Sequence, residues 1–184
     1  MLQSRRMPDL ARLVLLLALL PVRGEPALHG LSIALNGREV AVSFRLENGF
    51  QREVVERLES GLPTGFSFDL QLMRDRAHWW DEELDASRFE VVAMFNAVTR
   101  EYLVNTKKDG RLIDSKTLRD EGDLARAMTV FTALPAFTLD NPSPHERYLV
   151  RARVETGTTE ILGVFPHALR TPWLESNKVR VREP

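Results

Sequence analysis

The stretch LSIALNGREVAVSFRL, residues 31–46, decides the fold, because apolar and polar residues alternate on both sides of Asn36-Gly37. Successive side chains of a β-strand point to opposite faces, so each half presents one apolar face. Asn-Gly readily adopts the positive φ angles of a two-residue hairpin turn. The stretch therefore predicts a β-hairpin that turns at Asn36-Gly37. Its apolar faces are Leu31, Ile33 and Leu35 before the turn, and Val40, Val42, Phe44 and Leu46 after it.

The same alternation predicts further strands along the chain. Residues 66–72 carry phenylalanine or leucine at every second position, and residues 88–106 are long enough for two strands broken near Asn96. Lys107 to Gly110 predicts a tight turn into another strand. The polar residues 78–87 predict a turn. The remaining expected strands cover residues 111–115, 145–156 and 159–165, with a last one in the tail, 173–181.

Two segments change to the period of a helix. In the first, we expect Asn48 to cap the start, Gln51 to reach back as its partner, and Gly61 to end the helix before Pro63. The second is expected to begin at a capping Asp120 and to end near Leu134-Pro135. The apolar stripes are Phe50, Val54, Leu58 and Leu62 in the first helix, and Leu124, Ala127, Met128 and Phe131 in the second.

These elements predict a mainly β protein: an antiparallel β-sandwich-like domain with two helices packed at its edge or end. A parallel α/β fold is disfavoured, because strands and helices do not alternate regularly. The composition, with 43% hydrophobic residues in a chain of 184, suits one domain with a substantial core. We therefore expect a single β-rich globular domain over residues 25–184.

Residues 1–24 differ from the rest of the chain. The apolar run LVLLLALL, residues 13–20, is preceded by Arg5, Arg6 and Arg12 and followed by PVRG. A basic start, a short apolar run and a small residue at the end are typical of a secretory signal peptide. The run is also far shorter than the ~20 residues that span a bilayer. The sequence predicts a signal peptide over 1–24, an extracytoplasmic, periplasmic location, and no stable membrane span after cleavage. A buried N-terminal helix is the alternative.

Composition also narrows the classes of function. The formal net charge is −1, which gives no basic field for nucleic acid. The chain has no cysteine, so neither a disulfide framework nor a cysteine nucleophile is available. It also lacks a G-x-S-x-G nucleophile motif and the glycine-rich loops that hold ATP or NAD. We therefore assign no catalytic residue, no cofactor and no metal.

The candidate site is HWWDEEL, residues 78–84, with two tryptophans and three carboxylates. Alternation continued past residue 72 would place Arg74 on the inner face, so we expect the strand to bulge or leave the core there. One of Trp79 and Trp80 then packs inward and the other lies over the rim, and the acids that follow solvate a turn or begin a short helix. Trp79, Trp80 and Asp81 form the predicted interaction surface.

Other interpretations of this segment stay open. A metal site could use His78, Asp81, Glu82 and Glu83, although their spacing fits no regular motif. A glycosidase needs two carboxylates ~5–9 Å apart across a cleft, and the sequence places no second acid opposite. An exposed Trp80 could also line a peptide or glycan groove.

The order of several features resembles a family of uncharacterised exported bacterial proteins that is defined only by a domain of unknown function. The features are residues 58–63 after the first helix, the Phe66 strand, Trp79-Trp80-Asp81, and residues 96–104, followed by the second helix and the strand from Arg147. The resemblance covers roughly residues 28–182. It implies an extracytoplasmic location and no assigned activity. It also suggests a partner in envelope signalling, such as a membrane sensor kinase.

The sequence thus favours a non-enzymatic exported module that binds an unknown protein or small ligand in the cell envelope. It would use the tryptophan corner or an exposed sheet edge, where a partner strand can add. Two alternatives are an envelope hydrolase with carboxylates around Asp81 and a lipid-carrying protein. The second would need an apolar cavity between sheet and helices.

Overall fold

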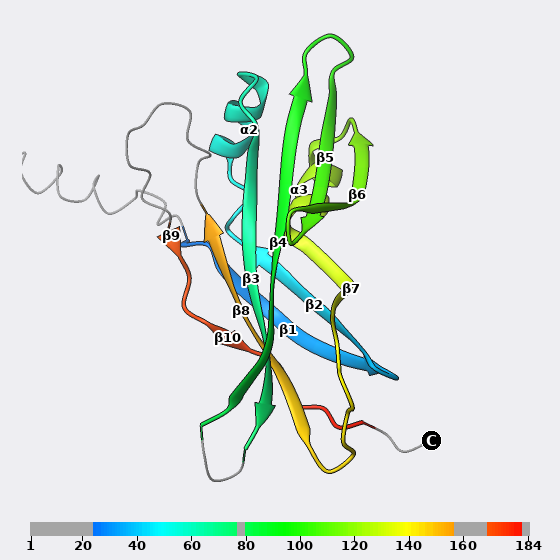
Figure 1. Cartoon of the computed structure of the whole chain (residues 1–184). Coiled ribbons are helices and arrows are strands. Elements are labelled where there is room, and N and C mark those ends of the chain that lie inside the picture. The colour runs from blue at the N-terminus through cyan, green and yellow to red at the C-terminus, as the bar shows by residue number, and fades with distance from the viewer. Residues whose placement is uncertain (1–23, 77–79, 157–168, 182–184) are drawn as a thin grey trace, which may run out of the picture.

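The computed structural model describes residues 24–76, 80–156 and 169–181. Over these residues the chain is a mainly β protein of two antiparallel sheets and two helices, as predicted (Figure 1). The elements are β1 (Ala27–Asn36), β2 (Glu39–Glu47), α2 (Arg52–Glu59), β3 (Thr64–Asp75), β4 (Glu82–Asn96), β5 (Glu101–Lys108), β6 (Arg111–Leu118), α3 (Glu121–Thr129), β7 (Val130–Thr138), β8 (Arg147–Thr156), β9 (Leu169–Arg170) and β10 (Leu174–Glu175).

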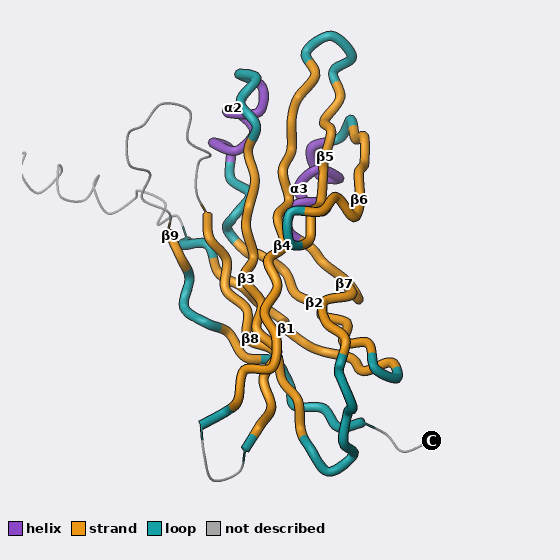
Figure 2. The backbone as a smooth tube through the Cα atoms, viewed as in Figure 1, coloured by secondary structure: helices purple, strands orange, loops and turns teal. Residues whose placement is uncertain are grey.

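The two sheets differ in size and lie face to face. The small sheet has the order β1-β2-β7, and the large sheet has the order β10-β8-β3-β4-β5-β6, with β9 on β8. In Figure 2 the strands of the small sheet run obliquely behind β3 and β4. Helix α3 continues this covering layer toward β5 and β6. One face of the large sheet is therefore buried, and the other, here called the outer face, carries no layer of described strands or helices.

The core consists of the apolar faces that the alternation predicts. Phe68 of β3 lies between the sheets, with its ring centroid 5.1 Å from that of Phe44 in β2 and 5.0 Å from that of Phe131 in β7. The rings are tilted or edge-on, as aromatic pairs prefer. The fully buried side chains include Val40, Val42, Leu58, Phe89, Val91, Leu124, Met128, Tyr148, Val150 and Val154.

The predicted hairpin is confirmed as β1 and β2, but its turn lies one residue further along. Asn36 pairs with Glu39, so the two loop residues are Gly37 and Arg38. Gly37 has φ +61°, whereas Asn36 and Arg38 have no positive φ. A two-residue turn with glycine first needs the left-handed conformation only at that glycine. Asn36 therefore stays in the strand.

Helix α2 is shorter at its start than predicted. It begins at Arg52 after the N-cap Gln51, and Asn48 adopts φ +56° in the loop before it, so the prediction that Asn48 caps this helix was wrong. The Gln51 amide donates to the Asn48 carbonyl at 2.8 Å. The end is as predicted, because Gly61 has φ +85° and its N–H donates to Leu58 O at 2.9 Å.

Helix α3 begins as predicted but ends early. The Asp120 carboxylate accepts from Asp123 N at 3.0 Å and caps the start. The helix then ends at Thr129, and residues 130–138 form β7, which pairs with β2. The predicted end near Leu134-Pro135 was therefore wrong. Phe131 satisfies a helical stripe and a strand face equally well, and pairing with β2 decides between them. Pro135 is tolerated because β7 is an edge strand.

The polar segment 82–87 is strand, not turn. It begins β4 and pairs with β3, with Glu82 opposite Arg74 and Asp85 opposite Leu72. Leu84 is the extra residue of a bulge, so the irregularity lies in β4 and not, as expected, in β3, which pairs with β8 in unbroken register through Asp75. The strand predicted over 159–165 lies outside the described residues. The tail forms the short β9 and β10 and a bridge from Val179 to Tyr148, rather than one strand.

Candidate interaction surface

The predicted site maps to the end of the large sheet where β3 passes into β4. Trp80 lies two residues before the start of β4, and 93% of its surface is exposed. Asp81 follows it, with its carboxylate 3.6 Å from the Arg151 guanidinium of β8. Trp79 and His78 lie outside the described residues. The structure therefore places Trp80 over the rim and anchors Asp81 to the neighbouring strand. The described residues of this region are here called the Trp80 corner: Arg74, Arg76, Trp80, Asp81, Glu82, Glu146 and Tyr148.

Arginines and glutamates fix the backbone at the Trp80 corner. Arg74 lies between two carboxylates, 3.5 Å from Glu82 and 3.3 Å from Glu146. Glu82 also pairs with Arg76. Tyr148, which is fully buried, donates its hydroxyl to Glu146 at 2.7 Å and accepts from Ser143 N. Burial raises the pKa of Tyr148, and its hydrogen bond to Glu146 raises it further. These contacts thus join the described ends of β3 and β4 to the residues that precede β8.

A second ion cluster holds the tail of the chain beside this corner. The Asp75 carboxylate lies 2.9 Å from the Lys178 amine and 2.6 Å from the Arg147 guanidinium, and only 7% of its side chain is exposed. The hydrogen bond from Lys178 lowers the pKa of Asp75, and Arg147 lowers it further against the opposing effect of burial. These contacts connect β3, β8 and the segment after β10.

The acids of the HWWDEEL segment do not converge. Asp81 faces Arg151, Glu82 faces Arg74 and Arg76, and Glu83 accepts from the Gln71 amide at 2.7 Å. Glu82 and Glu83 are successive strand residues, so they point to opposite faces. Among the described residues, no group of three or more histidines and carboxylates is placed to hold a metal ion.

Sequence reasoning missed a belt of ion pairs across the outer face, here called the outer-face belt. Asp69 lies 3.2 Å from Arg88 and 2.9 Å from Arg153, and Glu155 lies 3.5 Å from Arg88 and 3.2 Å from Arg170. Asp69 and the three arginines line a shallow hollow of about 440 Å³. Each arginine has a carboxylate partner, and Asp69 and Glu155 are each shared between two arginines. The sequence signal that could have indicated the belt is the row of charged residues on the polar side of β3 and β8, whose other side is apolar.

One tryptophan belongs to this belt. Trp173 packs under the Arg153 guanidinium, 4.4 Å from its ring centroid, and is 37% exposed. Such a contact is a cation–π interaction, which holds both side chains in place. Trp173 thus differs from Trp80, whose surface is almost bare.

The family model for DUF4390, "Domain of unknown function", matches residues 25–176. The chain belongs to the DUF4390 family. The predicted resemblance to a family of unknown function is thus confirmed, and the match includes every described strand and both described helices. Comparisons of this DUF4390 chain with curated proteins and with solved structures return no match. None of the helices in its described part is both long and apolar enough to cross a membrane.

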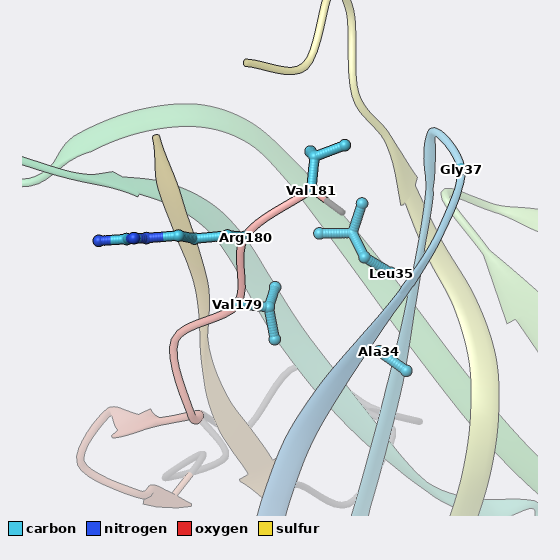
Figure 3. Close-up of a pocket in the computed structure, with 6 residues that line it drawn as sticks. All are labelled: Ala34, Leu35, Gly37, Val179, Arg180 and Val181. Atoms are coloured by element: carbon cyan, nitrogen blue, oxygen red, sulfur yellow. The ribbon is translucent and has the colours of Figure 1, made fainter. Parts of the chain in front are cut away.

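The DUF4390 domain also has an apolar hollow of about 420 Å³ between the β1–β2 hairpin and the tail (Figure 3). Leu35, Val179 and Val181 turn toward one another there, whereas Arg180 points away. The same three apolar side chains pack against the core. The hollow is therefore part of the contact that holds the tail against the hairpin.

Proposed function

We propose that this DUF4390 domain is an exported, non-enzymatic interaction module that binds a partner protein through the Trp80 corner. The observation that carries the proposal is the 93% exposure of Trp80 on a braced end of the large sheet. An exposed tryptophan leaves a large apolar surface in water, and a partner pocket that covers it gains that area. Tryptophan and arginine are also the residues that most often dominate binding energy at interfaces.

The surroundings of Trp80 favour a preorganised anchor. The paired strands and the contacts of Arg74 and Glu82 fix the backbone on either side, so little conformational freedom is lost on binding. Arg76, half-exposed beside Glu82, supplies a polar rim. This combination of a central aromatic residue and a charged rim suits a protein partner with an apolar pocket.

The proposed address is the periplasm, reached by a signal peptide over residues 1–24. The basic, apolar and small-residue regions of that segment support it, as does the absence of cysteine, which leaves the fold independent of the redox state. N-terminal sequencing of the protein recovered from the periplasm should begin near Glu25. Recovery of the chain with its initiator methionine from the cytoplasm would contradict the address.

The two alternative functions gain less support. A hydrolase with carboxylates around Asp81 would need two acids facing one cleft, and Asp81, Glu82 and Glu83 contact separate partners. A lipid carrier would need an apolar cavity behind α2, where Leu58 is fully buried in the core. We therefore keep the interaction module as the proposal.

The test compares Trp80→Ala with Trp173→Ala as a matched loss of one indole. Each variant and the wild type is titrated against the extracytoplasmic part of a candidate membrane sensor kinase, and against envelope extract. We expect Trp80→Ala to weaken binding roughly 30-fold, the effect of losing about 2 kcal/mol at an anchor. Trp173→Ala should leave binding within about threefold. Equal binding by wild type and Trp80→Ala would remove the corner as the site.

A further inference from the structure

Three edge strands, β1, β7 and β8, are partly covered along their free edges by side chains or by the tail. Asn177 bonds to both backbone groups of Ile33 on β1, at 2.9 and 3.4 Å. The Lys108 amine bonds to the carbonyls of Pro135 and Ala136 on β7, at 3.3 and 2.6 Å. The tail pairs along β8 through β9, β10 and the Val179 bridge. An unpaired strand edge is a template for another chain, and these contacts remove the template at three places.

Strand β6 has no comparable protection. It is the last strand of the large sheet, and Figure 1 shows it as the outermost strand on its side. Seven of its eight residues are exposed. Within residues 24–76, 80–156 and 169–181, no hydrogen bond reaches its outer backbone groups. Leu112 and Ile113 on the same strand are 58% and 46% exposed.

The register shows which backbone groups of β6 face outward. Asp109 N donates to Arg88 O at 2.8 Å, so the odd-numbered residues of β5 bond to β4 and the even-numbered ones bond to β6. Residues 102, 104 and 106 are opposite 118, 116 and 114. The backbone groups of Ser115 and Thr117 therefore point away from the sheet. The bulge at Ile113 ends the regular edge, which leaves residues 114–118 to pair.

We propose that β6 pairs antiparallel with β6 of a second copy of this chain, with Ser115 opposite Ser115 on the two-fold axis. In this register Lys116 of each copy lies directly opposite Asp114 of the other copy. These two symmetric pairs are at positions without backbone hydrogen bonds, where opposed side chains lie closest. A shift by two residues in either direction places Lys116 opposite Lys116 or Asp114 opposite Asp114. The charges thus select one register. A C2 dimer through this edge also leaves no unpaired β6 edge in either copy.

The choice of a second copy follows from the sequence of the edge. The Asp114 carboxylate and the Lys116 amine lie 2.9 Å apart on one face of β6. When two copies of the strand run antiparallel, the aspartate of each therefore meets the lysine of the other. Pairing would also cover part of Leu112 and Ile113. This interface is separate from the Trp80 corner and does not rest on the function proposed for that corner.

The first experiment uses charge reversal with rescue. Lys116→Asp gives a chain with two aspartates on this face, and Asp114→Lys gives a chain with two lysines, so each should dimerise about tenfold or more weakly than wild type in sedimentation equilibrium. Mixed at equal concentration, the two variants should form a heterodimer of wild-type strength. Neither chain then holds an internal Asp114–Lys116 pair, so the rescue can act only between copies. Failure of the mixture to associate, or a monomeric wild type at high concentration, overturns the proposal.

The second experiment reads the register. Because the chain has no cysteine, a single introduced thiol can cross-link only to another copy. Ser115→Cys places two thiols across the two-fold axis, where the Cα separation of about 5.5 Å suits a disulfide. Thr117→Cys is the control, since residue 117 would face residue 113. We expect rapid dimeric disulfide for Ser115→Cys and little for Thr117→Cys under mild oxidation. Equal yields, or the reverse order, would overturn this register.

Discussion

Replacing Phe68 by alanine tests the packing of the two sheets directly. The Phe68 side chain is completely buried and contacts Phe44 of one sheet strand and Phe131 of another, both in the small sheet. Its ring is therefore a main connection between the layers. Alanine would leave a cavity with walls from both sheets, and strands held by their ladders cannot collapse fully into it.

The expected loss is about 3–5 kcal/mol of unfolding free energy, the range for removal of a buried aromatic ring. Of this, the two aromatic contacts account for roughly 0.5–1.5 kcal/mol each. A domain of this size has a total stability of about 5–15 kcal/mol, so the variant should remain folded but unfold at a much lower urea concentration. Phe68→Leu keeps most of the volume and should lose about half as much, near 2 kcal/mol.

Urea unfolding followed by far-UV circular dichroism measures this effect. The midpoint should shift with little change in the slope m, because unfolding exposes nearly the same area in the variant and in the wild type. Ser67→Ala on the outer face is the control, with an expected change within about 0.5 kcal/mol. A loss below about 1.5 kcal/mol for Phe68→Ala, or equal losses for alanine and leucine, would refute the packing of Phe68 between the sheets.

Three further predictions concern the tail and the helix ends. Asp75→Asn should flatten the acid limb of a plot of stability against pH. The hydrogen bond from Lys178, together with Arg147, lowers the folded pKa of Asp75 below its ordinary 3.8. The ionised carboxylate therefore stabilises the fold above pH 3.8, and this stabilisation is lost as the pH falls through the folded pKa. An unchanged acid limb would contradict this. Asp120→Ala should lower the stability of α3 by about 1 kcal/mol in thermal unfolding, while Asp120→Asn should not, and equal effects would exclude a capping role. Gly61→Ala should cost roughly 1 kcal/mol or more at its positive φ, and a neutral result in urea would contradict the left-handed cap.

The fold was predictable where one local pattern has one outcome. In β3 the apolar residues at positions 66, 68, 70 and 72 need a single buried face, and the structure buries all four. The pattern failed where two structures satisfy it. Phe131 is three residues after Met128, which fits a helix, but its ring also completes the cluster with Phe44 and Phe68. Phe131 belongs to a strand because β7 pairs with the distant strand β2, and this pairing cannot be inferred from the residues around Phe131 alone.

The exposure of Trp80 at a strand end agrees with the expected corner, but its surroundings were not predictable. Trp79 lies outside the described residues, so the structure describes one indole of the pair. The outer-face belt was not predictable either. Asp69 and Arg153 are 84 residues apart, and they meet only because β3 and β8 pair in one register. Glu82 was expected in a turn because polar residues at a strand end look the same as a loop.

The two proposed surfaces are far enough apart to act together. Strand β6 pairs with β5, which in turn pairs with residues 89–96 of β4. Trp80 precedes residue 89 by about 30 Å of extended chain. A dimer through β6 would therefore leave both Trp80 corners uncovered and hold them at a fixed separation. Such a pair binds a two-fold partner more tightly than either corner alone, without any new contact.

This coupling predicts a specific pattern for Lys116→Asp. The variant should bind a monomeric partner fragment with the affinity of wild type, because the Trp80 corner is untouched. It should bind a dimeric partner at least tenfold more weakly, since it has lost the second point of attachment. Surface plasmon resonance against the fragment in monomeric and dimerised form separates the two cases, with Trp80→Ala as the variant that weakens both. A Lys116→Asp variant that loses affinity for the monomeric fragment would show that the edge and the corner are not independent.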